Sequence, residues 1–298
     1  MIVILTALSV EFEAVRPHVV DVTVQPHSAG TLFDVGHLEC QPNCQVALAT
    51  IGVGGLTTAT LTERAITEFR PSAVLFVGIA GGLREWLELG DVIAATKVYA
   101  YDGGRSEDEE FLARPRAWET SHAIDQVARR LPRGNRWHAL LPSEGEAVTP
   151  SVHFEAIAAG DVLLNSTKSP LRQQLRRNYN DAVAVEMESA GLALAGHLNG
   201  GVPAATIRGI SDLADGHKAA ADRGGSQRIA ARNAAAFAVT LAGELDRQLD
   251  QGPKGSPPQA TSRPHLPQIR NTNTARDNAR VGQQIGVHMG ALQDGAAK

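Results

Sequence analysis

The run at residues 73–77 is entirely apolar, Ala-Val-Leu-Phe-Val, and it leads directly into the small-residue sequence Gly-Ile-Ala-Gly-Gly at 78–82. A strand with no polar side chain on either face has to be covered on both sides, which is typical of the centre of a sheet flanked by helices. Along most of the chain, short apolar strands alternate with segments of helical periodicity. We therefore expect an α/β fold, a three-layer sandwich around a central mixed β-sheet.

The spacing of apolar residues predicts the other elements. Strands are expected at 2–8, 31–35, 45–51, 91–101, 138–141, 161–164, 182–185 and 204–208. Helices are expected at 10–15, 56–69, 152–159, 170–178, 187–198 and 227–249. The charged segment 106–116 is expected to be a surface loop.

The composition changes after residue 250. Gly-Pro-Lys-Gly-Ser-Pro-Pro at 252–258 breaks the periodicity, and the polar sequence that follows cannot bury enough apolar surface to offset its ordering entropy. We expect one catalytic domain at 1–250 and a mainly disordered tail at 251–298. Glycines recur every fourth residue near 276–291, beside apolar side chains, so this segment is either a docking peptide or an incidental part of the tail.

Several classes of protein are disfavoured. The net charge of −4 gives no electrostatic footprint for nucleic acid, and no apolar run is long enough to span a bilayer. The N-terminus lacks the charged segment of a signal peptide, so a cytoplasmic location is expected. Cys40 and Cys44 enclose only Gln-Pro-Asn, which favours a hairpin tip over a zinc site. No metal or organic cofactor is predicted.

Acidic groups or glycines follow several predicted strands, where α/β sheets place their ligands. The segments are 6–11, 77–82, 184–188 and 208–212. Each has an ordinary structural explanation alone, since an Asp after a strand is often a helix N-cap and glycines are common in turns. It is their order and spacing together that points to function.

In this order the segments resemble the nucleoside phosphorylase and nucleosidase superfamily, and most of all its methylthioadenosine/adenosylhomocysteine nucleosidase branch. The resemblance covers about residues 1–250. Its most specific parts are Val-Glu-Met-Glu at 185–188 and Ile-Ser-Asp at 210–212, supported by Gly-Val-Gly at 52–54 and Ala-Gly-Gly at 80–82. The resemblance implies cleavage of the bond between a purine base and its ribose.

The resemblance also assigns roles to individual residues. Asp212 matches the family position that protonates the purine as the bond stretches, which requires a carboxyl whose pKa is raised by burial. Ser211 would orient it. Glu188 matches the residue that grips the ribose hydroxyls and stabilises developing positive charge, and Met187 would lie against the sugar.

The nucleophile separates the two chemistries of the superfamily. In part of the family an Arg and a Ser hold phosphate after the central strand, but here those places hold Phe76 and Ile79, which cannot bind an anion. Glu11 matches the residue that, with Glu186, polarises water in the nucleosidases. Hydrolysis is therefore favoured over phosphorolysis. Arg208 is the best rival phosphate ligand and keeps the phosphorylase alternative open.

The substrate is less constrained. The nucleosidase pattern stacks the base on an aromatic residue, whereas this chain has Asp-Val-Leu-Leu at 161–164, so Leu163 and Leu164 would contact the base. Val53 would line the 5′ end of the ribose and suits a thioether better than a phosphate. The backbone of the glycine-rich turn, Ile79, Ala80 and Gly81, would complete the site. Futalosine or ordinary purine nucleosides remain possible substrates.

The family further implies a homodimer in which partner chains complete each other's 5′ pocket. Two rivals stand beside the nucleosidase hypothesis. One is a phosphate-dependent purine nucleoside phosphorylase. The other is a nucleosidase-like effector or sensor module that acts through a protein partner docked on the tail at 276–291. No nucleic-acid or membrane partner is predicted.

Overall fold

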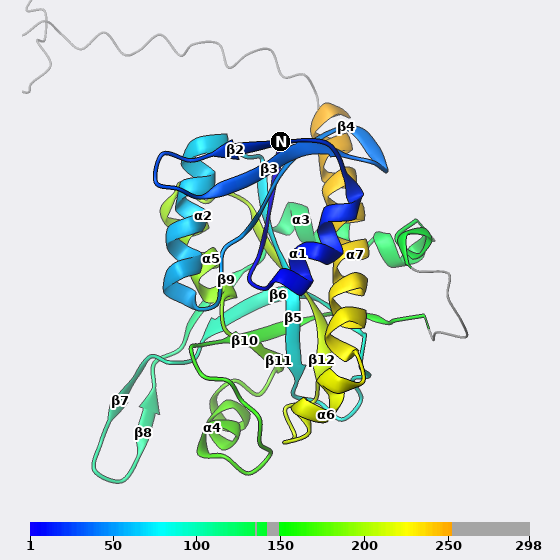
Figure 1. Cartoon of the computed structure of the whole chain (residues 1–298). Helices are drawn as coiled ribbons and strands as arrows, with labels where there is room; N and C mark the ends of the chain where they lie inside the picture. The colour runs from blue at the N-terminus through cyan, green and yellow to red at the C-terminus, as the bar shows by residue number, and fades with distance from the viewer. Residues whose placement is uncertain (135, 142–148, 252–298) are drawn as a thin grey trace, which may run out of the picture. The chain divides into compact units, whose positions relative to one another are not determined.

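A computed structural model of the chain describes residues 1–134, 136–141 and 149–251 (Figure 1). Its centre is a ten-stranded mixed sheet in the order β11-β10-β6-β12-β5-β1-β4-β3-β2, with β9 pairing on β6. The apolar run forms the central strand β5 (Ala73–Gly82), which pairs in parallel with β1 (Ile2–Thr6) and β12 (Ala204–Asp212). The predicted α/β fold around a mixed sheet is confirmed.

The remaining strands of the sheet are β2 (Val19–Pro26), β3 (Leu32–Leu38), β4 (Gln41–Thr50), β6 (Val92–Ala100), β9 (Arg116–Glu119), β10 (Val152–Ala159) and β11 (Ala182–Glu186). A separate hairpin consists of β7 (Gly104–Ser106) and β8 (Phe111–Ala113). The α-helices are α1 (Ser9–Val15), α2 (Gly55–Phe69), α3 (His122–Ala128), α4 (Pro170–Asn178), α5 (Ser189–Leu198), α6 (Lys218–Arg223) and α7 (Ser226–Gln251).

Helices cover both faces of the central strands because successive side chains of a strand point to opposite faces. In β1, Ile2 and Ile4 join the core cluster that includes α7 and α3, whereas Val3 and Leu5 join the cluster that includes α2 and α5. All four side chains are fully buried. None of the helices in the described part of the chain is long and apolar enough to cross a membrane.

Some predicted elements were wrong. Residues 152–159 form strand β10 and not a helix, because this segment pairs in parallel with both β6 and β11, and those pairings outweigh the helix propensity of its alanines. Residues 138–140 form a 3₁₀ turn, 161–164 form a loop, and 106–116 contains most of the β7–β8 hairpin. Strands β2 and β9 and helices α3 and α6 were not predicted.

The predicted strand 204–208 extends to Asp212, and the predicted last helix extends to Gln251. The predictions for the tail beyond Gln251, including the docking segment 276–291, lie outside the described residues.

Candidate active site

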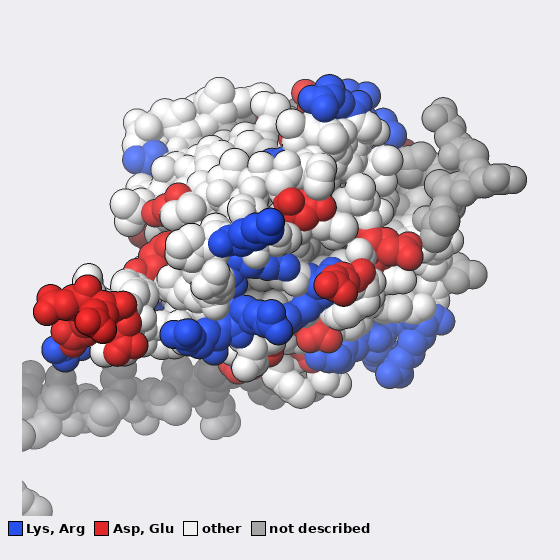
Figure 2. All heavy atoms as spheres, turned by 90° about the horizontal axis from the view of Figure 1, so that it is seen from below, with Lys and Arg blue, Asp and Glu red and all other residues white. Residues whose placement is uncertain are grey.

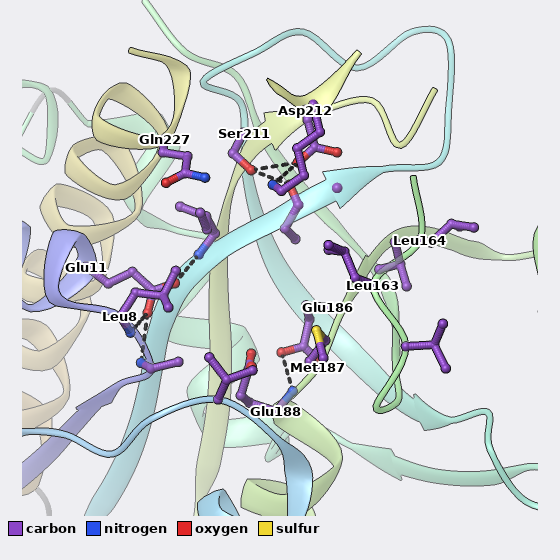
Figure 3. Close-up of a pocket in the computed structure, with 18 residues that line it drawn as sticks. Leu8, Glu11, Leu163, Leu164, Glu186, Met187, Glu188, Ser211, Asp212 and Gln227 are labelled. Atoms are coloured by element: carbon purple, nitrogen blue, oxygen red, sulfur yellow. Dashed lines mark hydrogen bonds and ion pairs between the residues drawn. The ribbon is translucent and has the colours of Figure 1, made fainter. Parts of the chain in front are cut away.

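One cavity of about 210 Å³ opens at the carboxyl ends of β1, β5, β11 and β12, the end at which α/β sheets bind ligands. We call it the acidic pocket because Glu11, Glu186, Glu188 and Asp212 line it; Figure 3 shows these side chains coming from different elements around one space. The other predicted residues that line it are Val53, Ile79, Ala80, Gly81, Leu163, Leu164, Met187 and Ser211. Arg208 is not part of the lining.

Glu11 is held at the start of α1 by three backbone N–H groups. Its Oε2 accepts hydrogen bonds from Ala7 and Leu8, both at 2.8 Å, and its Oε1 accepts one from Ile79 at 2.9 Å. Burial raises the pKa of this carboxyl above its ordinary value, although Arg208 and the backbone donors act to lower it. A fixed carboxylate with a raised pKa is suited to accept a proton near neutral pH.

Arg208 lies at the centre of a buried ion cluster. Its guanidinium bonds the Glu186 carboxylate, and its nitrogens lie 3.4 Å from Glu188 Oε2 and 3.9 Å from Glu11 Oε1. The guanidinium carbon also lies 4.3 Å from the centroid of the Phe76 ring. Burial alone would lower the pKa of Arg208, but the three carboxylates raise it, so the guanidinium stays charged. We refer to Glu11, Glu186, Glu188 and Arg208 as the ion cluster.

Gly78 allows the ion cluster to approach the central strand. A Cβ at this position would lie 2.0 Å from Arg208 Nη1 and 2.5 Å from Glu11 Oε1, so no larger residue fits without a shift. The two positions expected to be unable to bind phosphate behave differently from each other. Phe76 is fully buried, whereas Ile79 lines the acidic pocket and offers its backbone N–H to Glu11.

Glu186 and Glu188 flank the turn that leads into α5. Both oxygens of Glu186 are occupied: the backbone N–H groups of Glu188 and Ser189 donate to them at 3.1 Å, and Ser189 Oγ donates at 2.9 Å. Glu188 accepts fewer hydrogen bonds than Glu186. The Gly54 backbone N–H donates to its Oε1 at 3.3 Å. Burial raises the pKa of Glu188 to about 7, against the opposing effect of Arg208.

Asp212 is the last residue of β12, where three donors surround its carboxylate. Its Oδ1 accepts a hydrogen bond from the Ala214 backbone N–H at 3.0 Å, and its Oδ2 accepts one from Ser211 Oγ at 3.1 Å. Lys218 Nζ lies 2.8 Å from the same Oδ2. The predicted partnership of Ser211 with Asp212 is therefore present as a direct hydrogen bond.

Lys218, the first residue of the unpredicted helix α6, was not expected at the site. No periodicity distinguishes it, and the only available signal was its position six residues after Asp212 in a segment without a strand. Five further lining residues, mostly apolar, were also not predicted: Ala7, Leu8, Val162, Val185 and Gln227.

Apolar side chains form another part of the lining, which we call the apolar wall. Leu163 is 62% exposed, Val162 is 51% exposed and Val53 is 48% exposed, whereas Leu164 is buried. Exposed aliphatic groups beside a small cavity can bury the face of a flat ring or an apolar substituent. Within residues 1–134, 136–141 and 149–251, no group of His, Cys, Asp and Glu could hold a metal ion.

The fold and the acidic pocket define an α/β protein that binds a small molecule at the carboxyl ends of its strands. Comparison with known proteins shows to which family of such proteins the chain belongs. The chain belongs to the phosphorylase superfamily, whose sequence model matches residues 1–242, and the resemblance predicted from its motifs is thereby confirmed.

The relatives and solved structures that the chain resembles are named nucleosidases or futalosine hydrolases. The chain is 29% identical over 217 residues to the 5′-methylthioadenosine/S-adenosylhomocysteine nucleosidase of Chromohalobacter salexigens, covering 72% of this chain and 84% of that one. It is 30% identical over 195 residues to the ATP nucleosidase Cap17 of Escherichia coli, covering 59% of this chain; the match spans only 38% of that relative's length. The structure of futalosine hydrolase from Helicobacter pylori superposes with a TM-score of 0.66 at 25% identity, covering 82% of this chain and 97% of that one.

Proposed function

We propose that this chain hydrolyses the N-glycosidic bond of a purine nucleoside and releases the free base. The observation that carries the proposal is that Glu11 and Asp212, which the reaction needs on opposite sides of the sugar, line a single cavity with Glu188. The exposed side chains of Val53, Val162 and Leu163 line the same cavity as the carboxylates.

In the proposed reaction, Asp212 protonates N7 of the purine while the bond from the ribose carbon to N9 breaks and its electron pair moves to the base. Ser211, Lys218 and the Ala214 N–H hold this carboxyl in place. Glu11 takes a proton from water as the water oxygen bonds to the ribose carbon. The raised pKa of Glu11 supports its role as the base, and the contacts of Asp212 fix the position of its carboxyl.

Glu188 is the proposed ribose ligand, with Met187 against the sugar. Its pKa of about 7 means that binding of two hydroxyl donors would shift it toward the carboxylate form. Glu186 was expected to polarise water together with Glu11, but its contacts support another role. Because Ser189, the Glu188 backbone and Arg208 occupy its oxygens, we propose that it positions Arg208 and the turn rather than acting on water directly.

Hydrolysis is favoured over phosphorolysis by the surroundings of Arg208. The guanidinium is fully buried and its charge is offset by three carboxylates, so a phosphate would have to displace Glu11 or Glu188 to reach it. Negative side chains in a buried site repel a phosphate dianion. This arrangement supports water as the nucleophile.

The apolar wall supports a nucleoside with an apolar 5′ substituent, such as methylthioadenosine, as the substrate class. Val53 would lie at the 5′ end and Leu163 against the base. Because relatives include an ATP nucleosidase and a futalosine hydrolase, ATP and futalosine are the competing substrates.

We further propose that the fold is a three-layer sandwich and that the chain acts as a homodimer. Helices on both faces of β1 and β5 support the first statement. Leu56, 82% exposed at the start of α2, and Val53 next to it support the second, since a partner would bury them. Light scattering should give twice the chain mass at micromolar concentration; a fully active monomer would contradict the dimer.

The test is release of free base from methylthioadenosine, adenosylhomocysteine, futalosine, inosine, adenosine and ATP, each without phosphate. We expect release from at least one of the 5′-modified nucleosides. Asp212→Asn and Glu11→Gln should each reduce kcat by about 100-fold or more. Asp215→Asn, a nearby carboxyl that does not line the acidic pocket, serves as the matched control and should retain activity. No release from any of the six compounds would overturn the proposal.

A further inference from the structure

A second cavity, of about 510 Å³, lies between the turn after β5 and helix α4. Its lining includes Arg84, Arg172, Arg176 and Trp86, and it shares no residue with the acidic pocket. We call it the arginine pocket. Figure 2, which views the molecule from the end where α4 and α6 lie in Figure 1, shows Lys and Arg side chains gathered on this face of a chain whose net charge is −4.

Two of the arginines donate a hydrogen bond to a backbone carbonyl oxygen and have further N–H groups that could bind a ligand. Arg172 Nη2 donates a hydrogen bond to the Leu83 carbonyl oxygen at 2.9 Å, whereas its Nη1 is buried and has no partner among the described residues. Arg84 Nη2 donates to the Asn180 carbonyl oxygen. A buried guanidinium donor without a partner costs free energy, which a bound acceptor would recover.

The positive charges also repel one another. Arg172 and Arg176 lie four residues apart on α4, so they share one face of the helix, where like charges are destabilising. Burial, together with the neighbouring Arg84, lowers the pKa of Arg172. Within the described part of the chain, none of the three arginines forms an ion pair, although Glu85 also lines the cavity. A cluster of this kind is stabilised by an anion.

We propose that the arginine pocket binds a nucleotide, with the phosphate group on Arg84, Arg172 and Arg176 and the base against Trp86. Guanidinium groups match phosphate oxygens with paired hydrogen bonds, and the cavity has the size of small-molecule sites. Trp86 is 51% exposed on the lining, so its ring is available for stacking. This site is independent of the proposed hydrolysis, because no residue of the acidic pocket takes part in it.

The experiment measures AMP binding by isothermal titration calorimetry to the full chain in an Asp212→Asn background, which suppresses turnover. Arg84→Gln and Arg172→Gln should each weaken AMP binding by about 10- to 100-fold, because each removes charge-assisted hydrogen bonds. Arg177→Gln, on the same helix but outside the lining, is the matched control and should leave the affinity within about twofold. Adenosine should not gain or lose affinity in any of these variants.

Two further variants keep the test decisive. Arg176 is exposed, so Arg176→Gln will fold even if Arg172→Gln does not, and it should also weaken AMP binding at least about fivefold. Trp86→Ala should weaken binding of AMP but not of inorganic phosphate, because inorganic phosphate has no base to stack on the ring. Unchanged AMP affinity in the arginine variants, or an equal loss in Arg177→Gln, would overturn the proposal; the second result would indicate diffuse attraction to the basic face.

Discussion

Replacing Arg208 by methionine tests the physical basis of the ion cluster. The substitution leaves Glu11, Glu186 and Glu188 buried without their cation, and breaking a buried ion pair by removing one partner costs about 3–5 kcal/mol. Without Arg208, which lowers the pKa of Glu11 and Glu188, both carboxyls bind protons more readily in the folded state. The loss of unfolding free energy should therefore be larger at pH 8 than at pH 5.5. If the folded variant binds one more proton than the folded wild type over one pH unit, the difference is about 1.4 kcal/mol, and we expect at least this much.

Urea unfolding of the wild type and of Arg208→Met at the two pH values measures this difference. Arg208→Lys keeps the charge and should lose less than half as much as Arg208→Met. The matched control is Arg16→Met, because Arg16 is 38% exposed and pairs with Asp34 at 2.7 Å; an exposed pair contributes below about 1 kcal/mol. A loss for Arg208→Met that is the same at both pH values would refute the reasoning.

Three further predictions concern single residues. The pKa of Glu188 rises from 4.5 to about 7 on folding, so its protonated form favours the folded state; this part of the unfolding free energy is present below pH 4.5 and is lost as the pH rises through 7, by at most about 1.4 kcal/mol per pH unit. Glu188→Gln should remove that decline in urea titrations, and an unchanged pH slope would contradict the assignment. Leu163→Phe adds a ring beside the base and should lower KM by about 2- to 10-fold in steady-state assays, whereas a higher KM would place the base elsewhere. Gly191→Ala puts a Cβ 2.0 Å from the Gly55 carbonyl oxygen and should lower the unfolding free energy by about 1–3 kcal/mol; Gly134→Ala, where the nearest atom is 4.0 Å away, is its control, and equal losses would exclude the clash as the cause.

Much of the site was predictable because its residues follow the ends of apolar strands. The apolar run at 73–77 predicted a central strand, and its parallel neighbours β1 and β12 bring their carboxyl ends to one edge, so Glu11 and Asp212 lie near one another. The resemblance to a known family then supplied their order. The strand pattern and the family resemblance were therefore enough to group these residues, without any distance between their side chains.

The sequence could not predict contacts that depend on how strands bend and pair. Residues 152–159 have helix-forming alanines, and only pairing with two neighbouring strands makes them β10. The sequence also did not show that Arg208 is paired with carboxylates, because Glu186 and Glu188 lie about 20 residues before it and Glu11 lies near the start of the chain. Lys218 reaches Asp212 only because of the chain path through α6.

The identity of the sugar product tests the central claim most directly. The purified chain is incubated with a cleaved nucleoside in phosphate buffer, and the products are followed by proton and phosphorus NMR. Hydrolysis predicts free sugar and an unchanged inorganic phosphate signal, with the same rate when another buffer replaces phosphate. Accumulation of a sugar 1-phosphate, or a rate that depends on phosphate, would contradict the account.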